Sequence, residues 1–265
     1  MRKRVAAGIL LALIVASVLM VWTSKYGYAY QDREATMAAA SAQHWTGTDA
    51  LGRDRTVRVA AALLIGLGGA AAAAAITTAI AAAVGLLAAF SPAPVASVLM
   101  FVSDVFLSLP WLFLLMMARS LLPLTASPMQ MALITFLVLA ALGWPACART
   151  IYSGARTLRS SEWMLQGRAS GLRTGQLIKL HVVPYLRPLL LPQFLICVPA
   201  FIVAEANLGA LGLGIGEPVP SWGGMLMELD NSALLAQSHW VYLPIMLLVL
   251  VLLLIETFTI EERHA

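Results

Sequence analysis

The sequence predicts an all-α protein that crosses a membrane six times. Of its 265 residues, 60% are hydrophobic and only 11% are charged, which is about half the charged fraction of an average protein. Apolar runs of about the length that spans a bilayer recur along the chain and are separated by polar segments. Both cysteines lie in such runs without CxxC spacing, so we expect buried free thiols rather than a disulfide framework or a metal site.

The first two apolar runs differ in length and in what they predict. Residues 5–22 follow a basic cluster and exceed the roughly 7 to 15 residues of a signal-peptide core, so a retained membrane helix is expected. Residues 59–89 form a longer run that is expected to begin as an interfacial helix before it crosses. Its small residues, such as Gly66 and Gly69, allow the close helix contacts of a packed bundle.

Four further crossings are predicted after a tight turn at Ser91 and Pro92. They cover residues 95–118, 129–148, 185–204 and 240–259. The run 95–118 contains Asp104 and Pro110, and the run 185–204 contains three prolines that neighbouring helices must accommodate. Six crossings place both termini on the same side as the polar segment 149–184 and place the loop 207–235 opposite.

Lysine and arginine are distributed unequally between these two sides. The side with both termini and segment 149–184 carries 11 of them, and the other side carries 6. Because basic residues concentrate on the cytoplasmic side of membrane proteins, segment 149–184 and both termini are predicted to be cytoplasmic.

Residues 161–184, which we call the elbow segment, form a polar and basic island between two apolar runs. Helix start and stop signals recur in it: candidate N-caps at Ser160, Ser161 and Thr174, an acid at Glu162, a stop at Gly171, and an ending at Val183 and Pro184. The pattern predicts a short helix, a glycine turn and a second short helix.

This layout resembles the cytoplasmic coupling loop of ABC importer permeases, in which a glycine follows a Glu-Ala-Ala signature and a proline closes the segment. Gly171 and Pro184 match that spacing, but the three signature positions read Leu165, Gln166 and Gly167. Taken alone, the segment is also compatible with a basic loop that only fixes membrane orientation. The resemblance implies ATPase contacts in which Leu165, Gly167, Ala169 and Leu172 enter the ATPase cleft, Glu162, Arg168 and Arg173 form its polar rim, Gln166 also takes part, and Gly171 sets the angle.

A second motif, GTDxLGRD, lies within residues 44–54. It resembles the segment after the first transmembrane helix of importer permeases of the dipeptide, oligopeptide and nickel class. Thr48 or Asp49 can cap a short helix, and Gly52 allows a sharp bend. The charges can form a local ion-pair lattice, with a solvated charged loop as the alternative. The motif residues are Gly47, Thr48, Asp49, Gly52, Arg53 and Asp54.

A third motif, residues 205–226, resembles the same class through an acid, an LGLG run and a PSWGxML turn. Its glycines allow close backbone approach, and its prolines stiffen the exit of the loop. Trp222 is expected at the membrane interface. Nucleotide binding is not expected, because no Lys-Ser/Thr pair follows the glycines. The residues assigned to the outer loop or the pathway are Glu205, Gly212, Gly214, Pro220 and Trp222.

Two acidic residues require separate explanations. Asp104 lies in an apolar run, where a carboxylate costs about 2.5 to 3.5 kcal/mol, so it should have a partner or lie near an interface. A structural hydrogen-bonding role is favoured over a place on the translocation path. Glu205 stands at the outer end of the fifth predicted crossing, where it could equally bind the outer loop or line the pathway.

Together the three motifs imply the type I ABC importer permease fold. Residues 1–43 would form an N-terminal helix and the start of an extracytoplasmic segment, and residues 44–265 would form the permease core. The resemblance implies one permease of a heterodimer that imports peptides through a bacterial inner membrane. The implied partners are a second permease subunit, two ATPase subunits, an extracytoplasmic substrate-binding protein and membrane lipid, with no nucleic acid. ATP and Mg would be bound by the ATPase chains, and this chain would bind no cofactor.

Other functions remain open alternatives at this point. Nickel or another small solute is the alternative cargo, while a membrane-embedded enzyme and a plain anchor or channel belong to different classes. An enzyme would need convergent polar residues inside the helices, and only Asp104 is a candidate. The four histidines are far apart in sequence, and neither an HExxH nor a GxSxG motif occurs.

Overall fold

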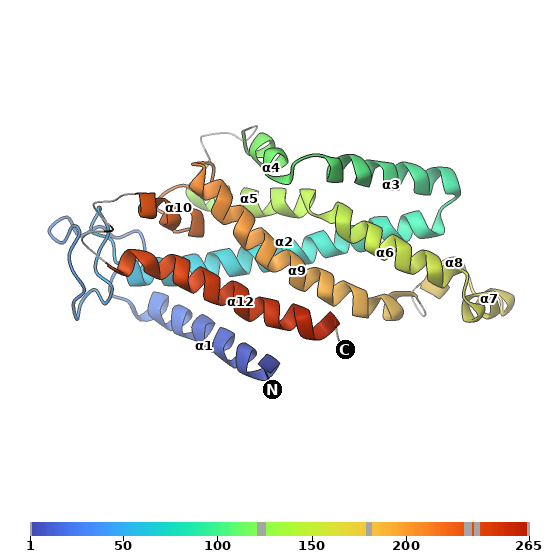
Figure 1. The fold of residues 1–265 in the computed structure, drawn as a ribbon, viewed down its shortest axis with the longest axis horizontal. Helices are drawn as coiled ribbons and strands as arrows, with labels where there is room; N and C mark the ends of the chain where they lie inside the picture. Colours follow the sequence, from blue (N-terminus) through green and yellow to red (C-terminus); the bar gives the residue numbers. More distant parts are fainter. Residues whose placement is uncertain (1, 121–125, 179–181, 231–234, 236–238, 264–265) are drawn as a thin grey trace.

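The computed structural model describes residues 2–120, 126–178, 182–230, 235 and 239–263, and the structural statements that follow concern these residues. Figure 1 shows an elongated bundle of helices that run roughly along its long axis. The end formed by residues 24–54 together with α10 (Trp222–Leu226) and the 3-10 helix η2 (Met227–Asp230) is the loop end. At the opposite end, the elbow end, α7 (Glu162–Ala169) and α8 (Thr174–Leu177) project beyond the bundle.

Five helical stretches of the described chain are long and apolar enough to cross a membrane. They are α1 (Arg2–Thr23), α2 (Arg55–Phe90), the consecutive helices α5 (Pro128–Leu142) and α6 (Trp144–Arg159), α9 (Val183–Ala210), and α12 (Leu243–Arg263), which follows the 3-10 helix η3 (His239–Tyr242). These stretches agree with five of the six predicted crossings. The prolines of the predicted run 185–204 lie inside the continuous helix α9, as expected.

The sixth predicted crossing is broken. Residues 95–118 fall on α3 (Ala93–Ser108) and α4 (Trp111–Ser120), whose axes are bent by 90°. The break falls at Pro110, where the sequence indicated an interruption, and the two helices pass the length and composition test for a membrane span only together. Leu109 is extended, with φ −87° and ψ 140°, because the ring of Pro110 disfavours helical geometry at the residue before it.

α2 is the central helix of the bundle and contacts α1, α3, α5, α6 and α9. It is one continuous helix of 36 residues and begins at Arg55, so residues 55–58 belong to the helix itself. Its glycines permit the close contacts that the sequence predicted. A Cβ atom at Gly69 would lie 2.2 Å from the ring of Phe136, and one at Gly85 would lie 2.9 Å from Ile151.

The first part of the polar segment is helical, because α6 ends only at Arg159. Past Arg149 the apolar residues still recur at helical spacing and are buried, which keeps the helix packed on the bundle; they are Ile151, Ala155 and Leu158. The end of the uninterrupted apolar run at Arg149 marks only where α6 becomes amphipathic, and the helix itself continues.

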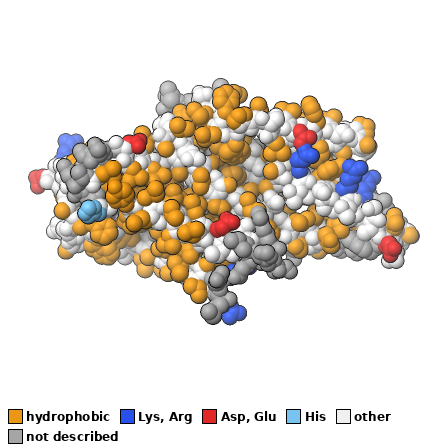
Figure 2. All heavy atoms as spheres, viewed as in Figure 1, with side chains coloured by type: hydrophobic (Ala, Val, Ile, Leu, Met, Phe, Trp, Pro, Cys, Tyr) orange, Lys and Arg blue, Asp and Glu red, His pale blue; other side chains and the backbone are white. Residues whose placement is uncertain are grey.

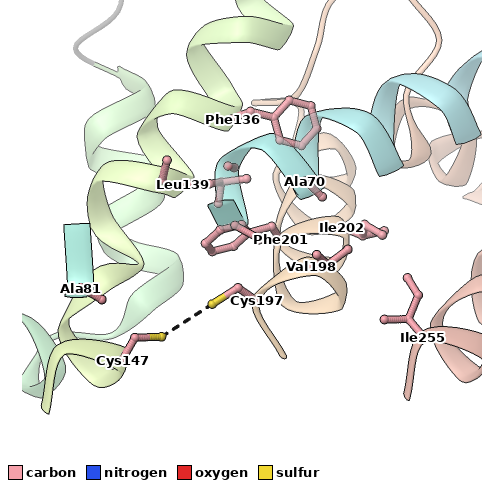
Figure 3. Close-up of a cluster of buried hydrophobic side chains, with 14 of the residues drawn as sticks. Ala70, Ala81, Phe136, Leu139, Cys147, Cys197, Val198, Phe201, Ile202 and Ile255 are labelled. Carbon is pink, nitrogen blue, oxygen red and sulfur yellow. Dashed lines mark hydrogen bonds between the residues drawn. The ribbon is translucent and has the colours of Figure 1, made fainter. Parts of the chain in front are cut away.

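The core lies where α2, α5, α6, α9 and α12 meet, and Figure 3 shows part of it. Cys147 of α6 and Cys197 of α9 are buried free thiols, as expected, and their Sγ atoms are 3.7 Å apart. Hydrophobic side chains also cover much of the outer surface in Figure 2, as expected for helices that face lipid.

Candidate functional site

The elbow segment contains the predicted helix, glycine turn and helix. Across the turn, the N–H of Leu172 donates to the carbonyl of Gly167 at 3.1 Å, and Gly171 has φ +80°. This is the hydrogen-bond pattern with which a glycine ends a helix. A Cβ atom at Gly171 would meet nothing within 4 Å, so the backbone conformation, and not crowding, requires glycine there.

The caps of these short helices differ from the prediction. The hydroxyl of Ser161 donates to a carbonyl in the last turn of α6 at 2.7 Å. Arg173, rather than Thr174, precedes α8, and its N–H donates to the side chain of Gln176 at 2.9 Å. Pro184 stands in the first turn of α9 instead of ending the second helix, so the role predicted for it is wrong.

The faces of the elbow segment are clearly divided. Met164 and Leu177 are fully buried, and Leu165 is 54% exposed. A Cβ atom at Gly167 would lie 2.5 Å from Leu177 Cδ2, so this glycine holds α7 against α8 instead of facing outward. Of the other predicted residues, Glu162, Gln166, Ala169 and Arg173 are exposed, Leu172 is half-buried against the core, and the side chain of Arg168 lies outside the described part.

At the loop end, the GTDxLGRD segment forms a buried ion-pair network. Arg53 Nε donates to Asp49 Oδ2 at 2.6 Å, and Arg53 also binds Glu217. Arg58 donates two hydrogen bonds to the same Glu217 carboxylate, at 3.0 and 3.1 Å. The ion-pair lattice is confirmed, and because both arginines are buried, the alternative of a solvated loop is wrong. Gly52 makes the predicted bend, with φ +75°.

The short helix that Thr48 or Asp49 was expected to cap is not formed, since residues 48–54 are not helical, and the same segment instead starts α2. Asp54 is the N-cap, and its carboxylate accepts the N–H of Val57 at 3.1 Å. Its other oxygen lies 2.8 Å from His44 Nδ1. Thr48, one of the two predicted caps, instead accepts a backbone N–H at 2.8 Å across the loop, and Gly47 turns the chain with φ +78°.

Several members of this network were missed by sequence reasoning. Glu217 and Glu228, which follow α9 in the sequence, belong to the same network. Arg55 pairs with Glu228 at 3.1 Å. Burial raises the pKa of the Glu228 carboxyl, and the charge of Arg55 partly opposes that rise. One signal was available. Arg53, Arg55 and Arg58 outnumber the acids of the motif, so a distant carboxylate was needed to balance them.

Glu205 of α9 is only 1% exposed. The polar groups that face its carboxylate are the Ser221 hydroxyl and the backbone N–H groups of Trp222 and Gly223 at the start of α10. Neither carboxylate oxygen reaches hydrogen-bonding geometry with a described residue. The sequence left open whether Glu205 contacts the outer loop or lines the pathway, and its position beside α10 matches contact with the outer loop.

Glycines bring α10 against α9 and α2. A Cβ atom at Gly209 would lie 2.4 Å from Gly223 Cα. Trp222 is 1% exposed and lies against Gly66, where a Cβ atom would be 2.5 Å from the indole nitrogen. The expectation that Trp222 faces the membrane interface is therefore wrong. Among the other residues of the motif, Gly212 turns the chain with φ +74°, Gly214 packs on Gly209, and Pro220 is buried.

Asp104 has the partner that its position required. Its carboxylate forms an ion pair with the guanidinium of Arg149, which joins α3 to α6. Both side chains are about half exposed, at 51% and 46%. The structural role favoured for Asp104 agrees with this contact.

A groove of about 540 Å³ runs between α4, α9 and α12. Its walls are mostly apolar, and Trp111 at its edge stacks on Phe201 with ring centroids 6.4 Å apart. Asn207 and Glu256 supply its polar groups, and Glu256 is exposed although the residues of α12 that precede it are apolar. Sequence reasoning did not single out either residue.

Comparisons with known proteins agree with the resemblance seen in the sequence. Residues 81–258 match the family described as binding-protein-dependent transport system inner membrane component. The chain is 30% identical to the dipeptide transport system permease protein DppC of Bacillus subtilis over 233 residues, which cover 88% of this chain and 70% of that protein. It is 32% identical over 253 residues to the oligopeptide transport system permease protein OppC of Mycobacterium tuberculosis H37Rv, covering 90% and 83% respectively. The corresponding values for OppC of Haemophilus influenzae are 28% over 248 residues, covering 90% and 75%.

Proposed function

The chain belongs to the family of binding-protein-dependent transport system inner membrane components and is an importer permease; from this premise we propose that it imports peptides and is driven by an ATPase that contacts the elbow segment. The peptide cargo is supported by the names of its relatives, which are dipeptide and oligopeptide permeases.

One observation carries the coupling proposal: α7 projects beyond the bundle and exposes an apolar side chain. α7 lies at the elbow end (Figure 1), where Leu165 is 54% exposed and the charged residues Glu162 and Arg173 are also exposed. An exposed apolar anchor with a polar rim is typical of a protein interface. α7 follows α6 after two residues, so a displacement of α7 would move α6 and the helix α2 packed along it as rigid bodies.

We place the translocation pathway and the contact with the second permease at the groove between α4, α9 and α12. A carboxylate facing lipid within a membrane helix would cost about 2.5 to 3.5 kcal/mol. We therefore place Glu256 toward water or the partner subunit. The groove would form this chain's half of the translocation pathway, in a heterodimer with a second permease. A substrate-binding protein would dock at the loop end, both termini would be cytoplasmic, and ATP and Mg would be held by two ATPase subunits.

Uptake of a labelled dipeptide into vesicles with the assembled transporter tests this function. Gly171→Leu should abolish uptake while the chain still inserts, because leucine disfavours the positive φ of the turn. Gly175→Leu is the matched control, since Gly175 also faces open space but has no positive φ. Normal uptake by the Gly171→Leu transporter, or failure of an ATPase subunit to copurify with the wild-type chain, would contradict the proposal.

A further inference from the structure

A second hollow, of about 1080 Å³, opens at the elbow end between the α2–α3 turn and α6. We call it the arginine hollow, because Arg149, Arg156 and Arg159 line it. Hydroxyl groups surround these arginines; they belong to Ser91, Ser97, Tyr152, Ser153, Thr157 and Ser160. No acidic residue of the described chain is part of its lining.

Two of the three arginines carry charges that no described carboxylate balances. Arg149 is paired with Asp104, but Arg156 and Arg159 form no ion pair with any described acid. Arg159 Nη1 donates to the backbone carbonyl of Ala89 at 2.9 Å, and Arg156 Nη1 donates to the hydroxyl of Tyr152. A guanidinium has five N–H donors, so most of the donors of both arginines remain available.

The arginine hollow lies at the depth expected for lipid headgroups. Arg149 follows Pro128, the first residue of α5, by 21 positions along one membrane-spanning stretch. At about 1.5 Å per residue this distance is roughly 32 Å, close to the hydrocarbon thickness of a bilayer. If α5 begins at one edge of the hydrocarbon, Arg149 stands at the other edge, and Arg156 and Arg159 lie in the headgroup layer beyond it.

An apolar surface leads from the arginine hollow toward the middle of the bundle. α3 starts at the hollow, and on its outer face Val98 is 61% exposed, Phe101 66% and Val105 43%. A ligand with an anionic head and apolar tails fits both surfaces at once. A soluble anion would use only the arginines, and a soluble protein would leave α3 uncovered.

We propose that the arginine hollow binds the phosphate of an anionic phospholipid in the cytoplasmic leaflet, with the acyl chains lying on α3. Arginine suits phosphate because its planar fork donates two parallel hydrogen bonds. Basic pockets between transmembrane helices on the cytoplasmic side are known to hold anionic headgroups. The proposal goes beyond import and rests only on the cytoplasmic orientation of the elbow end. The lipid would bridge α3 and α6 beside the elbow segment, where headgroup charge could influence how α6 moves.

Native mass spectrometry of the full-length chain in detergent can test this site. The probes are phosphatidylglycerol and phosphatidylcholine with identical acyl chains. Wild-type chain should bind phosphatidylglycerol more tightly, and Arg156→Gln/Arg159→Gln should weaken that binding about 30-fold, which corresponds to about 1 kcal/mol per arginine. Lys25→Gln/Arg33→Gln is the matched control, because it removes two exposed charges at the loop end, and it should bind like the wild type.

Two further arms keep the test decisive. Arg156→Gln alone spares the contact of Arg159 with α2, so it should fold normally and lose about 5-fold in affinity. Inorganic phosphate at about 10 mM, far above the lipid concentration, should not displace phosphatidylglycerol, because free phosphate lacks the acyl chains that would lie on α3. Equal binding of the two lipids, wild-type affinity in both arginine variants, or displacement by free phosphate would each overturn the proposal.

Discussion

Arg58 and Glu217 are 159 positions apart in the sequence, yet two hydrogen bonds join their side chains. Arg58 stands in the first turn of α2, and Glu217 lies in the loop between α9 and α10. Arg58 also donates to the carbonyls of Tyr28 and Pro218. One buried guanidinium therefore holds together three segments of the loop end.

The first prediction concerns the stability of the loop end. Arg58→Gln should destabilise the chain by about 1 to 3 kcal/mol, because it breaks a contact made by a buried charge. The loss of stability should be smaller than for a fully buried ion pair, because the side chain of Glu217 is half exposed. Thermal unfolding in detergent measures the change. Arg33→Gln removes an exposed charge nearby and should leave the midpoint unchanged. Equal midpoints for the two variants would show that the network adds no stability.

A second prediction uses two glycines of α2 that differ in their surroundings. Gly66→Ala should destabilise the bundle by about 1 to 3 kcal/mol, because the new methyl group collides with the Trp222 indole. Gly68→Ala meets nothing within 4 Å and should be neutral or stabilising by up to about 1 kcal/mol through helix propensity. Unfolding midpoints of both variants provide the comparison. Tolerance of alanine at both positions would contradict the packing of α10 on α2.

The third prediction concerns the ion pair between α3 and α6. Asp104→Asn and Arg149→Gln should each destabilise the chain, and the double variant should cost less than the sum of the two. The pair is half exposed, so a coupling energy of about 0.5 to 1 kcal/mol is expected from the double-mutant cycle. Strict additivity would mean that the two charges do not interact in the membrane.

The fourth prediction concerns the pathway. Glu256→Gln should leave stability nearly unchanged, because this side chain is exposed and has no described ion-pair partner. It should alter dipeptide uptake if the groove faces the passing substrate. Glu34→Gln, an exposed acid at the loop end, is the control. Unchanged uptake in both variants would move the pathway away from this groove.

The predictable parts of the fold depend on local patterns. Apolar run length identified five of the crossings, and the glycine turn at Gly171 followed from helix stop signals. Other boundaries depend on two local effects at once. Pro110 divides its apolar run into two helices, as the sequence indicated, while the buried stripe through Ile151 and Leu158 continues α6 past the residue at which composition changes from apolar to polar.

The candidate sites were only partly predictable because their partners are distant in sequence. The GTDxLGRD motif indicated a charge lattice, but not that Glu217 would close it. Trp222 looked like an interfacial residue until Gly66 was found to provide room for its ring inside the bundle. The resemblance selected Leu165 and not its apolar neighbour Met164 as an ATPase contact, and the packing of α7 leaves Leu165 exposed and buries Met164.

That adjacent pair provides the most direct test of the central claim, that an ATPase contacts the elbow segment. A photocrosslinking residue at position 165, where Leu165 is 54% exposed, should form a covalent product with an ATPase subunit in native membranes. The same probe in place of the buried Met164 should give little or no product. If the probe at position 165 captures no ATPase in a transporter that still imports peptide, the coupling role of this segment is refuted.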